Sequence, residues 1–397
     1  MKPRTTILGG GTPFTAALVE ALRAAEAALP AGELCLFGRS RASLETMKRY
    51  ATARLAPMGW TVSASDLLEE AVEGATVVVN QIRFGGLEAR ARDESLARQF
   101  GLPADETLGP SALSAALRII PPLAALAGDL GRRCSGAWVL NLANPLSVST
   151  AAMIRAGAPR KCVGLCELPS TTVAEACRLL GLPVDGVRWR YAGLNHRGFV
   201  FELALRDRDL LAQLPELLGG RTVFGVTAED IAAVGAIPLK YFRLCAGCGE
   251  GTAVQRAEFL LNLKQSISDE LQTSDQPPPS LSRRDFRWYG GAVVPMIVAI
   301  FADSGRELIV NQTHDDGLVW ELPARVFREG LEPVFVAPGG RVAGWLARFA
   351  AHERAVLEAI ESPSLSRIEH AIELDPCVSG GRVCEIARAV HSRLELS

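Results

Sequence analysis

The chain has 397 residues, of which 48% are hydrophobic and 22% are charged, and its formal net charge is −2. This composition is typical of a folded globular protein, and the length predicts two or three domains. Because charged residues form no long blocks of one sign, we expect a small-molecule ligand and no nucleic acid partner. The N-terminal apolar segment is too short for a signal peptide, and no apolar run reaches the roughly 18 residues of a membrane span, so we expect a cytoplasmic protein with no membrane partner.

The cysteines are spread along the chain and follow no secretory signal, which predicts reduced thiols. Cys245 and Cys248 form a CxxC pair. No second pair and no histidine cluster accompanies them, so the sequence does not favour a zinc or redox site there.

The first half of the chain alternates between strand and helix patterns. A strand at 5–8 leads into Gly9-Gly10-Gly11, and a helical pattern follows from about 15 to 27. Further predicted elements are strands at 33–37, 75–80 and 138–142, and an Ala- and Leu-rich helix at 111–131 that is interrupted by Pro121-Pro122. This alternation predicts an α/β fold with a Rossmann-like doubly wound parallel sheet.

Beyond about residue 165 the pattern is mixed. An alternating segment at 199–203 accompanies long helical patterns at 257–271 and 342–361, and the segment 274–280 is a loop. We therefore expect a dinucleotide-binding domain at 1–165 and a second, α+β domain at 166–397. Exposed helices rich in Ala and Leu favour a homodimer or homotetramer.

The glycine turn indicates a dinucleotide site. Gly9, Gly10 and Gly11 let backbone N–H groups approach a pyrophosphate next to a helix N-terminus, although Thr12-Pro13-Phe14 replaces the end of the usual GxGxxG spacing. The strand at 33–37 ends without the acidic residue that usually holds the adenosine ribose, and Arg39 could instead meet a 2′-phosphate. NADP therefore stays open beside NAD.

Six segments carry a more specific pattern. They are 80–86 (NQIRFGG), 106–110 (ETLGP), 116–121 (ALRIIP), 141–145 (NLANP), 164–169 (GLCELP) and 193–196 (GLNH). In this order they resemble the motifs of glycoside hydrolase family 4, and the similarity continues through Tyr241 and 321–323 (ELP).

The resemblance implies a lactate/malate-dehydrogenase-like domain joined to a second domain, with NAD and Mn²⁺ or another divalent metal as cofactors. It also implies a glycosidase that works on a small-molecule glycoside without net redox change, an exception to two-carboxylate hydrolysis. In the implied mechanism the nicotinamide takes hydride from carbon 3 of the sugar. The ketone acidifies the proton on carbon 2, the glycosidic oxygen is eliminated, water adds, and the ketone is reduced again.

The resemblance also implies roles for individual residues. Cys166 and His196 match the family's metal ligands, and a thiolate with an imidazole suits a divalent metal. Tyr241 matches the base for the carbon 2 proton. Glu167 lies where members that act on α-glycosides carry an Asp acid, so we expect an α-linkage. The remaining expected residues are Arg83, Asn144 and Asn195 for the substrate, and Gly9, Gly10, Gly11, Thr12, Phe14, Arg39, Asn80 and Gln81 for the cofactor.

The sequence departs from the family's phospho-glycoside pattern. Tyr289 and Pro295 stand where Arg and Ser are usual, and Asp105 replaces a Gln. The nearby Arg283, Arg284 and Arg287 offer donors to another anionic group at carbon 6, so the substrate hypotheses include a sulfoquinovoside, a carboxylate, a 6-phospho-glycoside and an uncharged sugar. Two other functions remain open: an NAD(P)-dependent sugar dehydrogenase, and a catalytically silent sugar or nucleotide sensor.

Overall fold

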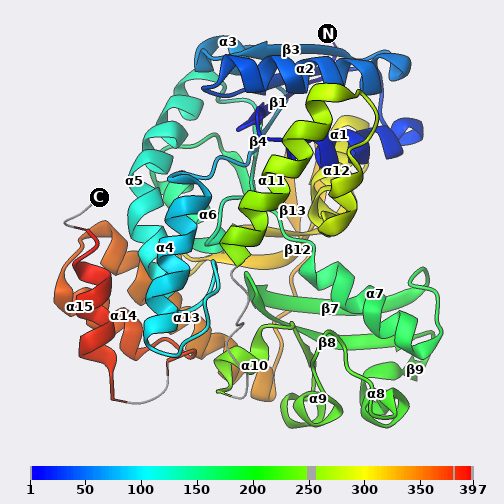
Figure 1. The fold of residues 1–397 in the computed structure, drawn as a ribbon. Coiled ribbons are helices and arrows are strands. Elements are labelled where there is room, and N and C mark those ends of the chain that lie inside the picture. Colours follow the sequence, from blue (N-terminus) through cyan, green and yellow to red (C-terminus); the bar gives the residue numbers. More distant parts are fainter. Residues whose placement is uncertain (1, 248–255, 379–380, 395–397) are drawn as a thin grey trace.

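One continuous sheet forms the centre of the computed structural model, which describes residues 2–247, 256–378 and 381–394 (Figure 1). Its strands lie in the order β10-β8-β7-β12-β11-β6-β5-β4-β1-β2-β3. The part from β3 to β6 is parallel, with β1 at Arg4–Leu8, β2 at Glu33–Phe37, β3 at Thr61–Ser65, β4 at Val77–Asn80, β5 at Trp138–Asn141 and β6 at Lys161–Gly164. The order 3-2-1-4-5-6 is that of dinucleotide-binding folds.

Helices cover both faces of the parallel part, which explains its continuous apolar strands. On β4, Val78 packs into one hydrophobic cluster while Val77 and Val79 pack into another on the opposite face. The helices of this half are α1 (Thr15–Ala24), α2 (Arg41–Leu55), α3 (Leu68–Val72), α4 (Gly86–Gln99), α5 (Gly109–Arg133) and α6 (Leu146–Arg155), with 3₁₀ turns at Glu26–Ala28 and Ala56–Met58. The predicted doubly wound sheet is thus present.

Helix α5 differs from two expectations. It runs unbroken through Pro121 and Pro122, so the predicted interruption was wrong. Both prolines are exposed, while Ile119, Ile120 and Leu123 are buried, and this packing outweighs the cost of about 3 kcal/mol that a proline adds inside a helix. The helix is also long and apolar enough to cross a membrane, with a mean hydropathy of 1.4, contrary to the prediction that no such segment exists. Since 61% of that window is buried, α5 packs as a core helix.

The second half extends the same sheet with antiparallel strands. They are β7 (Val187–Leu194), β8 (Arg197–Leu205), β9 (Arg208–Asp209), β10 (Ile237–Pro238), β11 (Arg306–Thr313), β12 (Val319–Phe327) and β13 (Gly330–Pro333). The pair of Asn311 on β11 with Gly164 on β6 joins the two halves, and the pair of Glu321 on β12 with Gly193 on β7 continues the sheet within the second half. These two junctions bring the ends of β6 and β7 to one region.

Helices surround this half as well. They are α7 (Leu168–Leu180), α8 (Leu210–Leu218), α9 (Ala228–Val234), α10 (Phe242–Cys245), α11 (Arg256–Thr273), α12 (Val294–Ala302), α13 (Gly340–Glu361), α14 (Leu365–Glu373) and α15 (Val383–His391), with a 3₁₀ turn at Pro279–Arg283 and a π turn at Tyr289–Val293. In Figure 1, α7 to α9 lie beside β7 and β8, and α11 crosses the front of the parallel half. The domain boundary at 165 remains a prediction.

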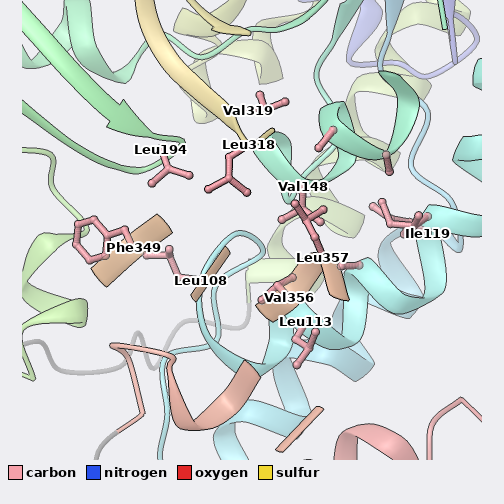
Figure 2. Close-up of a cluster of buried hydrophobic side chains, with 14 of the residues drawn as sticks. Leu108, Leu113, Ile119, Val148, Leu194, Leu318, Val319, Phe349, Val356 and Leu357 are labelled. Atoms are coloured by element: carbon pink, nitrogen blue, oxygen red, sulfur yellow. The ribbon is translucent and has the colours of Figure 1, made fainter. Parts of the chain in front are cut away.

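A hydrophobic cluster joins the two halves behind the end of β7. Leu194, the last residue of β7, lies with Leu318, Val319 and Phe349 in this cluster (Figure 2). Leu113 of α5 belongs to the same cluster. The turn that follows Leu194 is therefore anchored on a packed core.

The sequence led to two predictions about cysteines, one on their reduced state and one on the pair Cys245 and Cys248. Within the described residues the cysteines are free thiols, as predicted. Cys245 lies with its Sγ 3.6 Å from Sγ of Cys377, a contact that sequence spacing does not indicate. Cys248, its CxxC partner, lies outside the described residues.

Candidate active site

A cavity of about 1060 Å³ opens at the carboxyl ends of the parallel strands. Most of the predicted site residues line it: Gly9, Thr12, Phe14, Arg39, Gln81, Arg83, Asn144, Cys166, Glu167, Asn195, His196 and Tyr241. Gly10, Gly11 and Asn80 are not among its lining residues. Asn80 is fully buried and donates a hydrogen bond to Oδ1 of Asn141 at 2.9 Å, so it joins β4 to β5.

The glycine turn is held closely against β2. The N–H groups of Gly9 and Gly10 both donate to the carbonyl of Phe37, at 3.0 and 2.8 Å. A Cβ on Gly10 would lie 2.9 Å from the carbonyl oxygen of Ile7, so only glycine fits there. Within the described residues, the N–H groups of Gly11 and Phe14 donate to no acceptor. These two N–H groups, rather than those of Gly9 and Gly10, are therefore unpaired, and of the two residues Phe14 lines the cavity where a phosphate could bind.

Gln81 links the turn to a residue where the sequence departs from the family pattern. Its Nε2 donates to Oγ1 of Thr15 at 2.9 Å and to the carbonyl of Gly9 at 3.3 Å. Its Oε1 accepts a hydrogen bond of 2.6 Å from the hydroxyl of Tyr289. Tyr289 therefore supports the glycine turn through Gln81 and does not present a charge to the cavity.

Cys166 and His196 come from different elements, and both line the cavity. Cys166 follows β6, and His196 lies in the turn between β7 and β8 with φ of +64°. Burial lowers the pKa of His196 to about 3, so the ring is neutral, which is the form that binds metals. Its Nδ1 is buried with no hydrogen-bond partner in the described part of the chain. An orphaned nitrogen in a cavity that Cys166 also lines fits a metal ligand.

The donor set at this point is small. Within the described residues no group of three His, Cys, Asp or Glu side chains could hold a metal. Burial, and the carboxylates of Glu321 and Glu167, raise the pKa of Cys166 well above its ordinary value. A cation held by Cys166 and His196 would thus need further ligands from substrate or water, and it would offset the unfavourable charge on the thiolate.

Tyr241 lies directly on the histidine. The ring centroids of His196 and Tyr241 are 4.4 Å apart, and the planes differ by 17°. Burial raises the pKa of Tyr241 well above its ordinary value, and the nearby carboxylate of Asp105 adds to this effect. Nζ of Lys240 lies 4.9 Å from the centroid of the tyrosine ring. Sequence reasoning missed Lys240, since no motif contains it.

Glu167 is the N-cap residue of α7 and lines the cavity. Burial raises its pKa, so it holds a proton more readily than an exposed carboxyl group. A Cβ on Gly291 would lie 3.4 Å from Cβ of Glu167, so the glycine leaves room for this side chain. The geometry suits a proton donor.

Glu106 joins two residues that were predicted to bind substrate. Its carboxylate accepts hydrogen bonds from Nδ2 of Asn144 at 2.9 Å and from Nη1 of Arg83 at 2.8 Å. Arg90 donates a third, of 2.6 Å. Burial alone would raise the pKa of Glu106, but the guanidinium groups of Arg83 and Arg90 lower it well below its ordinary value. Glu106 lies in the ETLGP segment, which was the signal that could have singled it out.

Comparisons with known proteins agree with this arrangement. A family model described as "Family 4 glycosyl hydrolase" matches residues 4–182, and one described as "Family 4 glycosyl hydrolase C-terminal domain" matches residues 191–378. The chain belongs to glycosyl hydrolase family 4. The resemblance seen in the sequence motifs is confirmed, and the chain is an enzyme of the glycoside hydrolase class.

Some relatives of this family 4 enzyme match over nearly their whole length. A probable 6-phospho-beta-glucosidase of Bacillus subtilis (strain 168) is 27% identical over 414 aligned positions, which cover 95% of this chain and 93% of the relative. The 6-phospho-beta glucosidase structure from Thermotoga maritima with manganese, NAD⁺ and glucose-6-phosphate has a TM-score of 0.85 at 23% identity, with 98% of both chains covered. Malate dehydrogenase of Cryptosporidium parvum has a TM-score of 0.61 at 15% identity, covering 91% of this chain and 100% of that one. The predicted malate-dehydrogenase-like fold is confirmed.

In this family 4 enzyme Asn195 supports the site through a buried hydrogen bond to Glu321. It is fully buried, and its Nδ2 donates to Oε1 of Glu321 at 3.1 Å, as does Nδ2 of Asn311. The hydroxyl of Tyr191 also donates to Glu321. This network, with Glu321 at its centre, fixes the residue before His196, and sequence reasoning gave Glu321 no role because its partners are distant in sequence.

The three predicted arginines have different surroundings. Arg283 donates to Oγ of Ser266 at 3.3 Å, and Arg287 pairs with Asp285. Arg284 lines the cavity, 4.6 Å from the ring centroid of Trp288, and its Nε is buried without a partner among the described residues. Burial lowers its pKa to about 10, which keeps it charged at neutral pH. Arg284 is therefore a cation available to an anionic ligand.

Helix α11 adds two cations to the same wall. Arg256, Leu260 and Lys264 are spaced by four residues and line the cavity from one face of the helix. Nearby charges include Glu106, which is already paired with Arg83 and Arg90. This wall therefore favours a negatively charged substrate group.

Proposed function

We propose that this family 4 enzyme is an NAD-dependent and divalent-metal-dependent glycosidase that acts by oxidation at carbon 3, elimination, water addition and reduction. The observation that carries the proposal is the meeting of Cys166, His196 and Tyr241 in the cavity that also contains the glycine turn. The relative with manganese, NAD⁺ and glucose-6-phosphate supports both cofactors. When bound, the nicotinamide accepts and returns a hydride, and the cation draws electron density from a neighbouring carbonyl group.

The chain's own residues carry out the proton transfers. The phenolic oxygen of Tyr241 takes the carbon 2 proton, helped by the positive charge of Lys240 near its ring. Glu167, whose pKa is raised by burial, donates a proton to the leaving glycosidic oxygen, which favours α-glycosides with poor leaving groups. Arg83 and Asn144, oriented by Glu106, hold the sugar hydroxyls.

The substrate class follows from the charge of the cavity wall. We propose a sugar with an anionic group at carbon 6, held by Arg284 with Arg256 and Lys264. The 6-phospho-glycosidase relatives support this class. A 6-sulfonate or 6-carboxylate would use the same cations, because Arg pairs with any of these oxyanions. A cytoplasmic location and a homodimer or homotetramer remain predictions.

The test is a panel of nitrophenyl α-glycosides that carry a phosphate, sulfonate, carboxylate or hydroxyl at carbon 6. Each is incubated with and without NAD and Mn²⁺, while nitrophenol and NADH are measured separately. We expect nitrophenol to be released only when both cofactors are present. NADH should not accumulate. Net NADH formation would instead indicate a sugar dehydrogenase, and binding without turnover would indicate a sensor.

A further inference from the structure

The carboxyl end of β2 lies next to the glycine turn. In the sheet, β2 lies between β1 and β3, which are labelled and drawn in blue in Figure 1. The carbonyl oxygen of Phe37, the last residue of β2, accepts hydrogen bonds from the N–H groups of Gly9 and Gly10. A Cβ on Gly38 would lie 3.6 Å from the backbone nitrogen of Gly11. In dinucleotide-binding folds the residues at this strand end meet the adenosine ribose and so decide between its 2′-hydroxyl and a 2′-phosphate.

The carboxylate that selects the 2′-hydroxyl is missing from this strand end. Residues 37–43 read FGRSRAS and contain no acid. After the neighbouring β3, Asp66 accepts a hydrogen bond of 2.7 Å from Nε of Arg41, and Glu70 of α3 accepts one of 2.7 Å from Oγ of Ser65. Neither carboxylate lines the cavity, so neither replaces the missing acid.

A cationic donor stands there instead. Arg39 lines the cavity together with Gly38 and Thr12, and it has no ion pair or hydrogen bond within the described residues. Arg41, in contrast, is held by Asp66. A guanidinium group without a partner in a ligand cavity presents a planar fork of N–H donors that matches phosphate oxygens.

Two serines stand beside this arginine. Oγ of Ser40 caps α2 by accepting the N–H of Ser43 at 3.3 Å, and the two hydroxyl oxygens are 3.0 Å apart. A Cβ on Gly11 would lie 3.4 Å from Cβ of Ser43, so the pair is adjacent to the glycine turn. Both serines are exposed and neither lines the cavity, so Arg39 is the donor that the cavity itself presents at this strand end.

We propose that this end of the cavity binds the 2′-phosphate of NADP, with Arg39 as the selecting residue. The inference rests on the proposed function, because it requires that the glycine turn binds a dinucleotide. The nicotinamide is the same in both cofactors, so the proposed glycosidase chemistry is unchanged. The chain would differ from its NAD-bound structural relatives only at the adenosine end.

The test measures binding of NADP⁺ and NAD⁺ to the full chain by isothermal titration calorimetry. We expect NADP⁺ to bind at least about tenfold more tightly than NAD⁺. Arg39→Ala should remove most of this preference by weakening NADP⁺ alone, and Arg39→Asp should reverse it in favour of NAD⁺. Arg41→Ala is the matched control, because Arg41 is held by Asp66, and it should leave the preference within about twofold of the wild type.

Each other outcome overturns the inference. Tighter binding of NAD⁺ than of NADP⁺ by the wild type would overturn it while leaving the proposed function intact. If Arg39→Ala loses affinity for both cofactors equally, then Arg39 does not distinguish a 2′-phosphate from a 2′-hydroxyl. Failure of both cofactors to bind would overturn the inference together with the dinucleotide part of the proposed function. Circular dichroism on each variant separates loss of binding from loss of folding.

Discussion

The ring of His196 stacks on the ring of Tyr241 with 4.4 Å between centroids, which ties the proposed metal ligand to the proposed base. His196 is fixed by the turn between β7 and β8, and Tyr241 begins α10. Because the two side chains touch, a change at either position must be designed to keep the stack. Phenylalanine at 241 retains the ring and removes only the phenolic oxygen.

The variant Tyr241→Phe should therefore lose turnover by about 10²–10⁴-fold, which is typical for removal of a general base. Dinucleotide affinity should change little, because the glycine turn does not contact this side chain. In the wild type, product formed in deuterated water should carry deuterium at carbon 2 and none at carbon 3. Retention of the carbon 2 proton, measured by NMR, would contradict the elimination mechanism.

Glu167→Gln should impair substrates according to their leaving group. An alkyl alkoxide needs a proton to depart, whereas a nitrophenolate does not, so activity on alkyl α-glycosides should fall by about 10²-fold or more and on nitrophenyl α-glycosides far less. The measurement is kcat/KM for one sugar with both aglycones. Equal losses on both would show that Glu167 is not the acid.

Glu321→Gln should weaken metal binding without touching a metal ligand. Glu321 accepts hydrogen bonds from Asn195, Asn311 and Tyr191, and an amide cannot accept from all three because its nitrogen is a donor. Loss of such an outer partner typically weakens metal affinity about 10–100-fold. Mn²⁺ titration followed by electron paramagnetic resonance of the free ion measures this directly.

The matched control is Glu332→Gln on β13, where an exposed carboxylate pairs with Arg325. This control should leave the Mn²⁺ affinity unchanged. If Glu321→Gln binds Mn²⁺ as tightly as the wild type and has the same fold by circular dichroism, then the network does not position the turn before His196.

Much of the fold could be predicted because its elements have strong local patterns. The run Glu33–Phe37 was predicted with the bounds that the structure has, since a strand buried on both faces is continuously apolar. Helix α13 was predicted within two residues of its start. The junctions Asn311 with Gly164 and Glu321 with Gly193 left no local pattern, because each depends on pairing between strands far apart in the chain. The continuation of α5 through Pro121 and Pro122 was missed for the same reason, because it depends on tertiary packing.

The sequence predicted which residues belong to the candidate site better than it predicted how they are arranged. Motif resemblance indicated Cys166, His196 and Tyr241, and the structure brings them together, while their roles remain predictions. Sequence alone could not show that Arg284 keeps a free nitrogen while the neighbouring arginines are paired. It also could not show that the N–H groups of Gly9 and Gly10 are already bound to β2, because both facts depend on tertiary contacts.

Glu106 gives the protein a stability that depends on pH. Its folded-state pKa lies below the value of about 4.3 expected in the unfolded chain, because Arg83 and Arg90 favour the carboxylate. The carboxylate therefore stabilises the fold above pH ~4.3, and this contribution is lost as the pH falls through the folded-state pKa. Glu106→Gln should lower the free energy of unfolding at pH 7 by about 2 kcal/mol, the usual scale for hydrogen bonds to a charged group that is partly buried.

Urea unfolding of the wild type and Glu106→Gln at pH 7, 5.5 and 4 measures this difference. The gap should be constant between pH 7 and 5.5 and should begin to narrow by pH 4, because acid adds protons to the unfolded wild type before the folded one. Glu45→Gln is the control, since Glu45 is exposed and pairs only loosely with Lys48, so its effect should stay within about 1 kcal/mol at every pH. A gap that widens on acidification would mean that Glu106 is protonated in the folded protein, and then it could not hold Arg83 and Asn144 in place for the sugar.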